Sequence, residues 1–265
     1  MIVYDLRTQP LSIGDFLNYM EVGEVIGDKD IAFSYDPASP VIRSPAFSHI
    51  NAGNFMHHFA PFLSFTDKVF TKKAYGSWPP AHYRNQYVHY YIHNEVLKNG
   101  IKPLTMKSLP WAKKFLQEHS AKYVIQVRNN FLTTNRNSNW MAWLNFLRRR
   151  KENFVLIGTL GEIREELRLP NVIVAKDHNT TMEQDMALVE AADVFMGASS
   201  GPATIAIFNN KPYRVFNTNV SAGWVDGYVM ENGRGHFRFS VENQVMIKGH
   251  ESADLIEKEF EECNR

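Results

Sequence analysis

Short apolar runs alternate with helix-compatible segments from residue 121 to residue 217, and this alternation most constrains the fold. The strand-like runs are rich in Val, Ile and Phe and stand at residues 122–127, 153–158, 171–175, 193–197 and 212–217. The segment after the first run has helical spacing, with Trp140, Trp143 and Leu147 on one face. Apolar strands separated by helices are typical of a parallel sheet covered on both faces. The second half is therefore predicted to be a Rossmann-like α/β domain.

Further helices are expected between the later strands. The segments are residues 162–169, a short helix; residues 180–192, with Thr180 or Thr181 as N-cap; and residues 201–210. The strand at 212–217 is interpreted as the last one of the sheet. The glycine-rich segment 220–239 is expected to be a loop over a cleft, and a helix is expected to close the chain.

The first half is less regular but has the same α/β character. Strands are expected at 1–6, 30–36 and 67–72, and helices at 14–26, 49–65 and 83–100, the last closed by Gly100. Residues 101–110 contain two prolines and are interpreted as a linker. The prediction is a small, irregular N-terminal half at 1–108 and a C-terminal Rossmann-like half at 109–265.

Composition excludes several classes of protein. The chain has 265 residues, a net charge of +1 and 22% charged residues, so no bulk charge favours nucleic acid as a partner. Its single cysteine, Cys263, cannot form an internal disulfide. No apolar run approaches the roughly 20 residues of a membrane span. We therefore expect a cytoplasmic protein without a transmembrane segment, and peripheral membrane association stays open.

Polar residues follow three of the expected strands, where ligands of parallel sheets bind. They are Arg128 after the first strand, Gly158 and Thr159 after the second, and Ser199, Ser200, Gly201 and Pro202 after the fourth. Proline suits a first helical turn, whose free N–H groups attract anions. Hydroxyl groups and a bidentate arginine complete a phosphate cradle. The pattern predicts a phosphate site without a P-loop lysine motif and without G-x-G-x-x-G.

Simpler interpretations of the same residues stay open. The Ser-Ser-Gly-Pro turn could serve only as a helix N-cap, and Arg128 could be a surface ion-pair partner. Asp15 follows Gly14 at an expected helix start, where it is either an N-cap or a carboxylate able to accept a proton. His89 and His93 have a spacing that can bind metal, but no glutamate motif accompanies them, so no metal is expected.

Two segments resemble glycosyltransferases of the GT-B fold. The segment 195–217 is similar to the G-x-D-[ST]-G-P-x-H region of ADP-heptose-type transferases, with Gly197, Ser200, Gly201 and Pro202 at matching positions. Ser199 stands where that family has Asp, and Thr204 where it often has His. The segment 124–130 resembles the H-x-R motif of fucosyltransferase-like enzymes, with Arg128 matching and Gln126 in place of the histidine.

The resemblance implies a set of site residues and an activity. It implies two Rossmann-like halves of GT-B type, with the donor diphosphate on Arg128, Ser199, Ser200 and Gly201, and Thr204 beside them. The loop with Asp177 would neighbour the donor base and ribose, and Asp15 would be the catalytic base. The implied enzyme is an inverting, metal-independent hexosyl- or heptosyl-type transferase that needs no cofactor. It would move a sugar from a nucleotide-diphosphate donor to a glycan or lipid-linked acceptor in polysaccharide biosynthesis.

Two other functions fit the same scaffold. One is a nucleotide-sugar epimerase or hydrolase, which would need a water-activating carboxylate near the donor. The other is a non-catalytic binding protein that retains the fold. The fold alone does not separate these functions.

Overall fold

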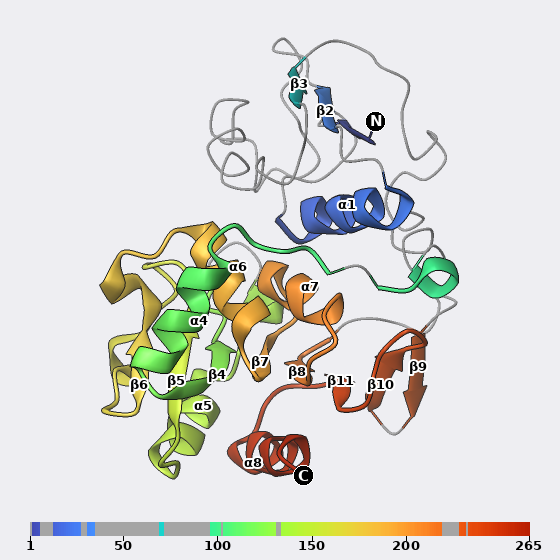
Figure 1. Cartoon of the computed structure of the whole chain (residues 1–265). Coiled ribbons are helices and arrows are strands. Elements are labelled where there is room, and N and C mark those ends of the chain that lie inside the picture. The colour runs from blue at the N-terminus through green and yellow to red at the C-terminus, as the bar shows by residue number, and fades with distance from the viewer. Residues whose placement is uncertain are drawn as a thin grey trace. The chain divides into compact units, whose positions relative to one another are not determined.

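The chain forms two compact units (Figure 1). The structure, a computed structural model, describes residues 2–5, 13–27, 31–34, 69–71, 96–101, 103–130, 134–218, 228–231 and 233–265. Unit 1 takes residues 1–104 with 223–227, and unit 2 takes residues 105–222 with 228–265. The first division falls after residue 104, whereas the sequence suggested residue 108.

Unit 1 contains a small parallel sheet and a helix. Its elements are β1 (Ile2–Asp5), α1 (Ile13–Ile26), β2 (Ile31–Ser34) and β3 (Val69–Thr71), with the strands in the order β1-β2-β3. Helix α1 buries Phe16, Leu17 and Tyr19, which explains why an apolar segment here is helical. The strands and the first helix expected in this half are confirmed.

The helix expected at 83–100 is described only at its end. Residues 96–99 are helical, and the N–H of Gly100 donates to the carbonyl of Val96 at 2.8 Å. Gly100 has φ +78°, a left-handed conformation that glycine adopts without strain, so its role as the helix end is confirmed. The helix expected at 49–65 lies outside the described residues.

Unit 2 is built on an eight-stranded sheet in the order β6-β5-β4-β7-β8-β11-β10-β9. The strands are β4 (Ala121–Gln126), β5 (Asn153–Ile157), β6 (Val172–Val174), β7 (Val194–Ala198), β8 (Tyr213–Phe216), β9 (Tyr228–Glu231), β10 (Arg234–Phe237) and β11 (Gln244–Ile247). Strands β6 to β11 in this order pair in parallel, and β10 and β9 continue the sheet antiparallel. The parallel part has the 3-2-1-4-5-6 order of Rossmann folds, so the predicted Rossmann-like α/β fold is confirmed for this half.

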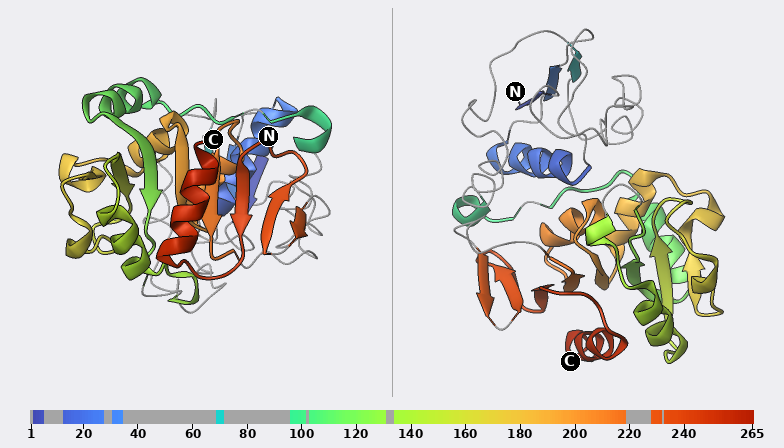
Figure 2. Two further views of the ribbon diagram at one scale, coloured as in Figure 1. Left: turned by 90° about the horizontal axis from the view of Figure 1, so that it is seen from below. Right: turned by 180° about the vertical axis from the view of Figure 1, so that it is seen from behind.

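Helices cover both faces of this sheet. They are α4 (Leu109–Glu118), α5 (Trp140–Arg148), α6 (Met182–Ala191), α7 (Gly201–Ile207) and α8 (Ala253–Cys263). Helices α4, α6 and α7 lie on one face, and α5 and α8 pack together on the other (Figures 1 and 2). The core beneath α5 and α8 contains Trp143, Phe146, Phe154 and Phe260, all nearly inaccessible to solvent. Among the described helices, none is both long enough and apolar enough to cross a bilayer.

Side-chain caps fix where several helices begin. The Thr181 hydroxyl accepts from the N–H of Gln184 at 3.2 Å, and the Gln184 side chain accepts from the N–H of Thr181 at 2.8 Å. This reciprocal capping box confirms a helix start at 181 and decides between Thr180 and Thr181. Asn139 and Ser252 cap α5 and α8 in the same way, by accepting from Ala142 and Leu255.

Two local expectations for unit 2 are wrong. Residues 162–169 form only a single 3-10 turn, Glu165–Leu167, in place of the expected helix. The strand at 213–216 is not the last one, since β9, β10 and β11 follow it. Part of the segment interpreted as a loop over a cleft is instead a hairpin, in which Glu231 pairs with Arg234. The Asn232-Gly233 sequence between them is a strong hairpin signal, and Gly233 has φ +77°.

The segment before α4 is fixed to α6. The backbone N–H of Met106 donates to the Glu190 carboxylate at 2.7 Å, and that of Ser108 donates to Glu183 at 2.9 Å. Burial raises the pKa of Glu190, and the hydrogen bond from Met106 opposes that shift. This part of the expected linker is therefore an ordered edge of unit 2.

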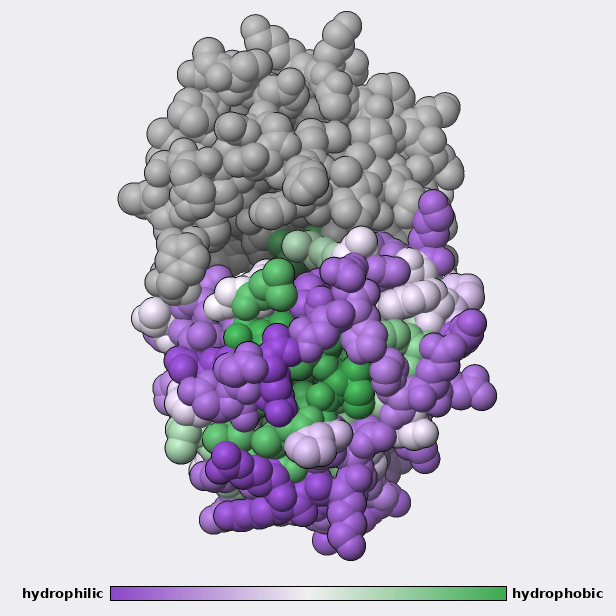
Figure 3. Space-filling model, turned by 90° about the vertical axis from the view of Figure 1, so that its left-hand side faces the viewer, coloured by the Kyte–Doolittle hydropathy of each residue, from purple (hydrophilic) through white to green (hydrophobic). Residues whose placement is uncertain are grey.

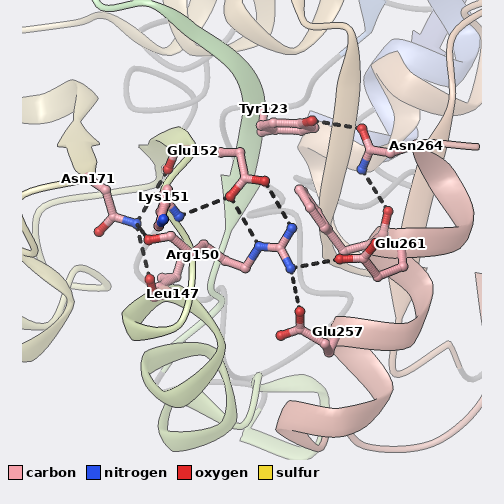
Figure 4. Close-up of polar contacts among 10 residues, drawn as sticks. Tyr123, Leu147, Arg150, Lys151, Glu152, Asn171, Glu257, Glu261 and Asn264 are labelled. Atoms are coloured by element: carbon pink, nitrogen blue, oxygen red, sulfur yellow. Dashed lines mark hydrogen bonds and ion pairs between the residues drawn. The ribbon is translucent and has the colours of Figure 1, made fainter.

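A partly buried cation joins α8 to the start of β5. The Arg150 guanidinium contacts Glu152 at 2.9 Å, Glu261 at 2.8 Å and also Glu257 (Figure 4). Its carbon Cζ lies 4.3 Å from the centre of the Phe260 ring. Since the side chain is 13% exposed, solvent screens these contacts less than it screens surface pairs. The cluster holds the terminal helix on the sheet at the amino end of the strands.

The free edge of the parallel part is β6. On that side of the molecule, apolar residues lie between polar ones (Figure 3). Val172 and Val174 are buried, Ile173 is partly exposed, and Leu160 in the preceding loop is 70% exposed. The strand has only three residues, so little unpaired backbone is open to another strand.

Candidate functional site

The strand order of unit 2 reverses between β4 and β7. Strand β4 pairs with β5 on one side and with β7 on the other. The chain leaves β4 toward α5 and leaves β7 toward α7, on opposite faces of the sheet. Ligands of such sheets bind outside the carboxyl ends of the strands at this switch point. The residues that follow Gln126 and Ala198 are therefore the candidates for a site.

Arg128 lies directly beyond the end of β4 and is only 8% exposed. Its N–H donates to the Ser138 hydroxyl at 3.1 Å, and its carbonyl accepts from the N–H of Ser138 at 2.9 Å. Burial, followed by the charge of Arg136, lowers the pKa of Arg128, while Glu162 opposes the shift. Arg128 is therefore not an exposed surface side chain, and its role in an anion site stays a prediction.

The turn after β7 is tied to the end of β4 by a side-chain hydrogen bond. The Ser200 hydroxyl bonds to the Gln126 side-chain oxygen, and it lies 3.1 Å from the carbonyl of Ala198. Ser200 occupies the N-cap position of α7, but its side chain makes no capping bond. The alternative that this serine only caps a helix is therefore not supported, because its hydroxyl bridges the two strands at the switch point.

The neighbours of Ser200 have the expected backbone roles. Pro202 lies in the first turn of α7, as predicted from its missing N–H. The N–H of Ser199 donates to the carbonyl of Phe216 at 3.1 Å, which joins the turn to β8. Gly201 is partly exposed, and Thr204 is 7% exposed on α7. The structure thus gathers Ser199, Ser200 and Gly201 at one turn and buries Thr204 behind them.

The loop after β5 brings a carboxylate toward Arg128. The Glu162 carboxylate accepts from the N–H of Thr159 at 3.4 Å and from the Thr159 hydroxyl at 3.3 Å. Gly158, with φ +150°, makes the turn out of the strand, and a Cβ there would lie 3.8 Å from Glu162. Because Glu162 influences the pKa of Arg128, its carboxylate belongs to the same electrostatic environment.

Glu162 and Arg136 were not singled out from the sequence. Glu162 was assigned to a short helix at 162–169 that does not form, so its charge had no assigned neighbour. Arg136 stands in a polar loop without periodicity, where no pattern marks one residue above another.

Asp177 has a different partner from the one that the resemblance implies. Its carboxylate pairs with Arg168, which also contacts Glu165 at 2.7 Å. The next residue, His178, packs its ring 4.9 Å from the ring of His119, which follows α4. No described contact joins Asp177 to Arg128, and its assignment to a ribose site stays a prediction.

Asp15 is the third residue of α1 in unit 1, two residues after the helix begins at Ile13. Its side chain lies outside the described residues, so its role as a base stays a prediction. The alternative that Asp15 is the N-cap is wrong, because an N-cap residue precedes the first helical residue. His89 and His93 also lie outside them. Within the described part of the chain, no group of three or more His, Cys, Asp or Glu side chains is arranged to hold a metal ion.

Comparisons with known proteins give no relative from which a function could be transferred. No protein-family model matches the chain. No curated protein and no solved structure matches it either. A function is therefore inferred from the chain's own residues and their arrangement.

Proposed function

We propose that unit 2 binds a nucleoside diphosphate at the switch point between β4 and β7, as the donor site of a glycosyltransferase. The observation that carries the proposal is the buried Arg128 beyond the end of β4, in a sheet of Rossmann order. A buried guanidinium at this position favours an anion with two adjacent oxygens, such as a phosphoryl group, which it can bind through two parallel hydrogen bonds.

The turn after β7 supports a phosphate rather than a carboxylate ligand. On the other side of the switch point, the Ser199 hydroxyl and the backbone N–H of Gly201 are the donors proposed for the ligand, since the Ser200 hydroxyl donates to Gln126 and the N–H of Ser199 donates to Phe216. A group with several oxygens can accept from both loops at once. In a transferase, the same donors would stabilise the negative charge of the leaving diphosphate as the glycosidic bond breaks.

The step beyond binding rests on the resemblance to GT-B enzymes. The acceptor hydroxyl would lose its proton to a carboxylate as its oxygen attacks the anomeric carbon, and the nucleoside diphosphate would leave. Asp15 is the carboxylate that the resemblance assigns to this role, with inversion at the anomeric carbon and without metal. Epimerase, hydrolase and non-catalytic binding functions are the competing outcomes.

Binding is tested on the full chain by calorimetry and thermal unfolding with ADP, GDP, UDP, CDP and TDP. A ligand at 100 times its dissociation constant stabilises the folded state by about 2.7 kcal/mol. Arg128→Ala should weaken the binding of whichever diphosphate responds by about 1.5–3 kcal/mol, the range for a hydrogen bond to a charged group. Arg149→Ala is the matched control, because that exposed arginine pairs with Asp254 on α8.

The outcomes separate the functions. If no diphosphate binds the wild-type chain, the proposal is wrong. If a folded Arg128→Ala variant binds as tightly as the wild type, the site lies elsewhere. Where a diphosphate does bind, the matching nucleotide sugars are assayed with Asp15→Asn. Retained binding with lost transfer supports the transferase, whereas sugar release or epimerisation without an acceptor supports its rivals.

A further inference from the structure

Two histidine rings lie against each other in unit 2, at the end of α4. His119 directly follows the last residue of α4, and His178 ends the 3-10 turn Ala175–His178 that follows β6. The centres of the two rings are 4.9 Å apart, and the ring planes meet at 72°. The contact therefore joins two connections of unit 2 that are far apart in the sequence.

A buried phenylalanine contacts both histidines. Phe115 on α4 is 6% exposed, and its ring centre lies 4.4 Å from that of His119 and 5.1 Å from that of His178. Because one packed ring touches both imidazoles, the pair has less freedom to move than two separate surface histidines. A pair that is already restricted loses less conformational entropy when a ligand fixes it.

The backbone on each side of the pair is held by other contacts. The Asn153 side-chain amide donates to the carbonyl of His119 at 2.9 Å. In the turn that ends at His178, the Lys176 ammonium group contacts the Asp185 carboxylate at 2.7 Å. These contacts do not use the imidazole rings. The two rings are therefore brought together by the fold, whatever they bind.

The ring nitrogens of the pair take part in no hydrogen bond or ion pair within the described ranges. His119 bonds through its backbone, and the described contacts of the His178 side chain are with aromatic rings. His119 is partly exposed and His178 is exposed, so a small ion in solution can reach them. A neutral imidazole nitrogen carries a lone pair, and it is a preferred ligand of zinc, copper and nickel ions.

The separation of the rings fits two imidazoles on one metal ion. A zinc–nitrogen bond of about 2.0–2.1 Å places the centre of the bound ring about 3.2 Å from the metal. Two such rings lie about 5.2 Å apart at a tetrahedral angle and about 4.5 Å apart at a right angle. The observed 4.9 Å lies between these values. The ion requires the two rings to turn toward it while their centres stay at the observed distance.

We propose that His119 and His178 form a two-histidine site for a divalent transition-metal ion, with Zn²⁺ as the probe. The ion binds one ring nitrogen of each histidine, and water takes its remaining positions. It fastens the turn after β6 to the end of α4. Catalytic zinc sites have three protein ligands and structural sites four, so an ion on two ligands is held less tightly. The inference does not depend on the proposed nucleotide site.

Zinc binding is measured by calorimetry on the full chain at about pH 7.5, where a free imidazole is neutral. The chain has ten histidines, so the zinc that the double variant His119→Gln/His178→Gln still binds is subtracted as binding elsewhere. The wild type should bind one Zn²⁺ more than this variant, and Mg²⁺, which prefers oxygen ligands, should not compete. Either single substitution should weaken the site at least about tenfold, because it removes one of two protein ligands. His236→Gln, which changes an exposed histidine of β10, should leave it unchanged.

A second measurement needs no variant. When a small amount of paramagnetic Cu²⁺ is added to the wild type, the ring-proton NMR signals of His119 and His178 should broaden together, because the ion lies beside both rings. The proposal is wrong if the double variant binds as much zinc as the wild type. It is also wrong if only one of the two signals broadens, since that result indicates an adventitious ion only, on a single histidine. Urea unfolding without metal verifies that the variants fold.

Discussion

Gly197 lies in β7 opposite Gln126 of β4, and adding a single methyl group there tests how closely the two strands approach. A Cβ at Gly197 would lie 2.9 Å from the Gln126 carbonyl oxygen, 3.0 Å from its Cβ and 3.2 Å from its backbone nitrogen. Two of these atoms belong to the backbone of a central strand, so they cannot move aside as a flexible side chain would. Gly197→Ala must therefore strain the sheet at the switch point.

The expected cost is about 1–3 kcal/mol, the usual penalty for adding a methyl group to a packed core. At about 2–4 °C per kcal/mol for a domain of this size, the midpoint of thermal unfolding should fall by about 2–12 °C. Urea unfolding followed by tryptophan fluorescence measures the change, because Trp143 is fully buried in unit 2. Displacement of Gln126 by the added methyl group should also weaken nucleoside diphosphate binding, since Gln126 bonds to Ser200.

Gly161→Ala is the matched control. This glycine lies in the loop after β5, and a Cβ there would meet no atom within 4 Å. The same substitution should therefore be neutral, or should stabilise by up to about 1 kcal/mol by restricting the unfolded chain. A folded Gly197→Ala variant as stable as Gly161→Ala would refute the close approach of β4 and β7, and with it the tight switch point.

Three further predictions follow from individual contacts. Glu162→Gln should tighten diphosphate binding by up to about fivefold in calorimetry, since it removes a negative charge near Arg128; weaker binding would contradict the proposed polarity of the site. Arg214→Met should cost about 3–5 kcal/mol in urea unfolding, because it leaves the buried Glu259, 2.9 Å away, with one cation fewer; a stability equal to the wild type would contradict this. A hydrogen bond from the Arg150 guanidinium lowers the pKa of Glu152 below its ordinary value of 4.5. The stability from this pair is therefore full above pH 4.5 and is lost as pH falls through the lowered pKa. The gap between wild type and Glu152→Gln should shrink over that range, and a constant gap would exclude the linkage.

The sequence by itself determined the strands β4 to β8 of unit 2, whereas the parallel strand β11 was not predicted. Runs such as Phe154–Ile157 are apolar at every position, which is typical of a short strand buried on both faces. The start of α6 could also be predicted from the sequence, because Thr181 and Gln184 cap this helix through hydrogen bonds between residues only three positions apart. The hairpin of β9 and β10 was not predicted, because the glycine content of segment 220–239 suggested a loop. The sequence Asn232-Gly233 is typical of a hairpin turn and could have indicated it.

Only the tertiary structure decided how the candidate site is assembled. Gln126 and Ser200 are 74 residues apart, and their contact depends on β4 and β7 becoming neighbours in the sheet. In this strand order α5 and α8 pack together on one face, and α4, α6 and α7 lie on the other.

The electrostatics of the site also had to come from the structure. Arg128 was found from the sequence as a residue beyond a strand end, but its burial and its proximity to Arg136 and Glu162 were not. Sequence patterns report periodicity, and periodicity places residues on faces of helices and strands. Charged residues in loops follow no periodic pattern. Which of them lie close together depends on hydrogen bonds within the loops, such as those between Asn130 and Asn137. The sequence therefore determined the scaffold and the strand ends, and the folded chain determined which charges meet there.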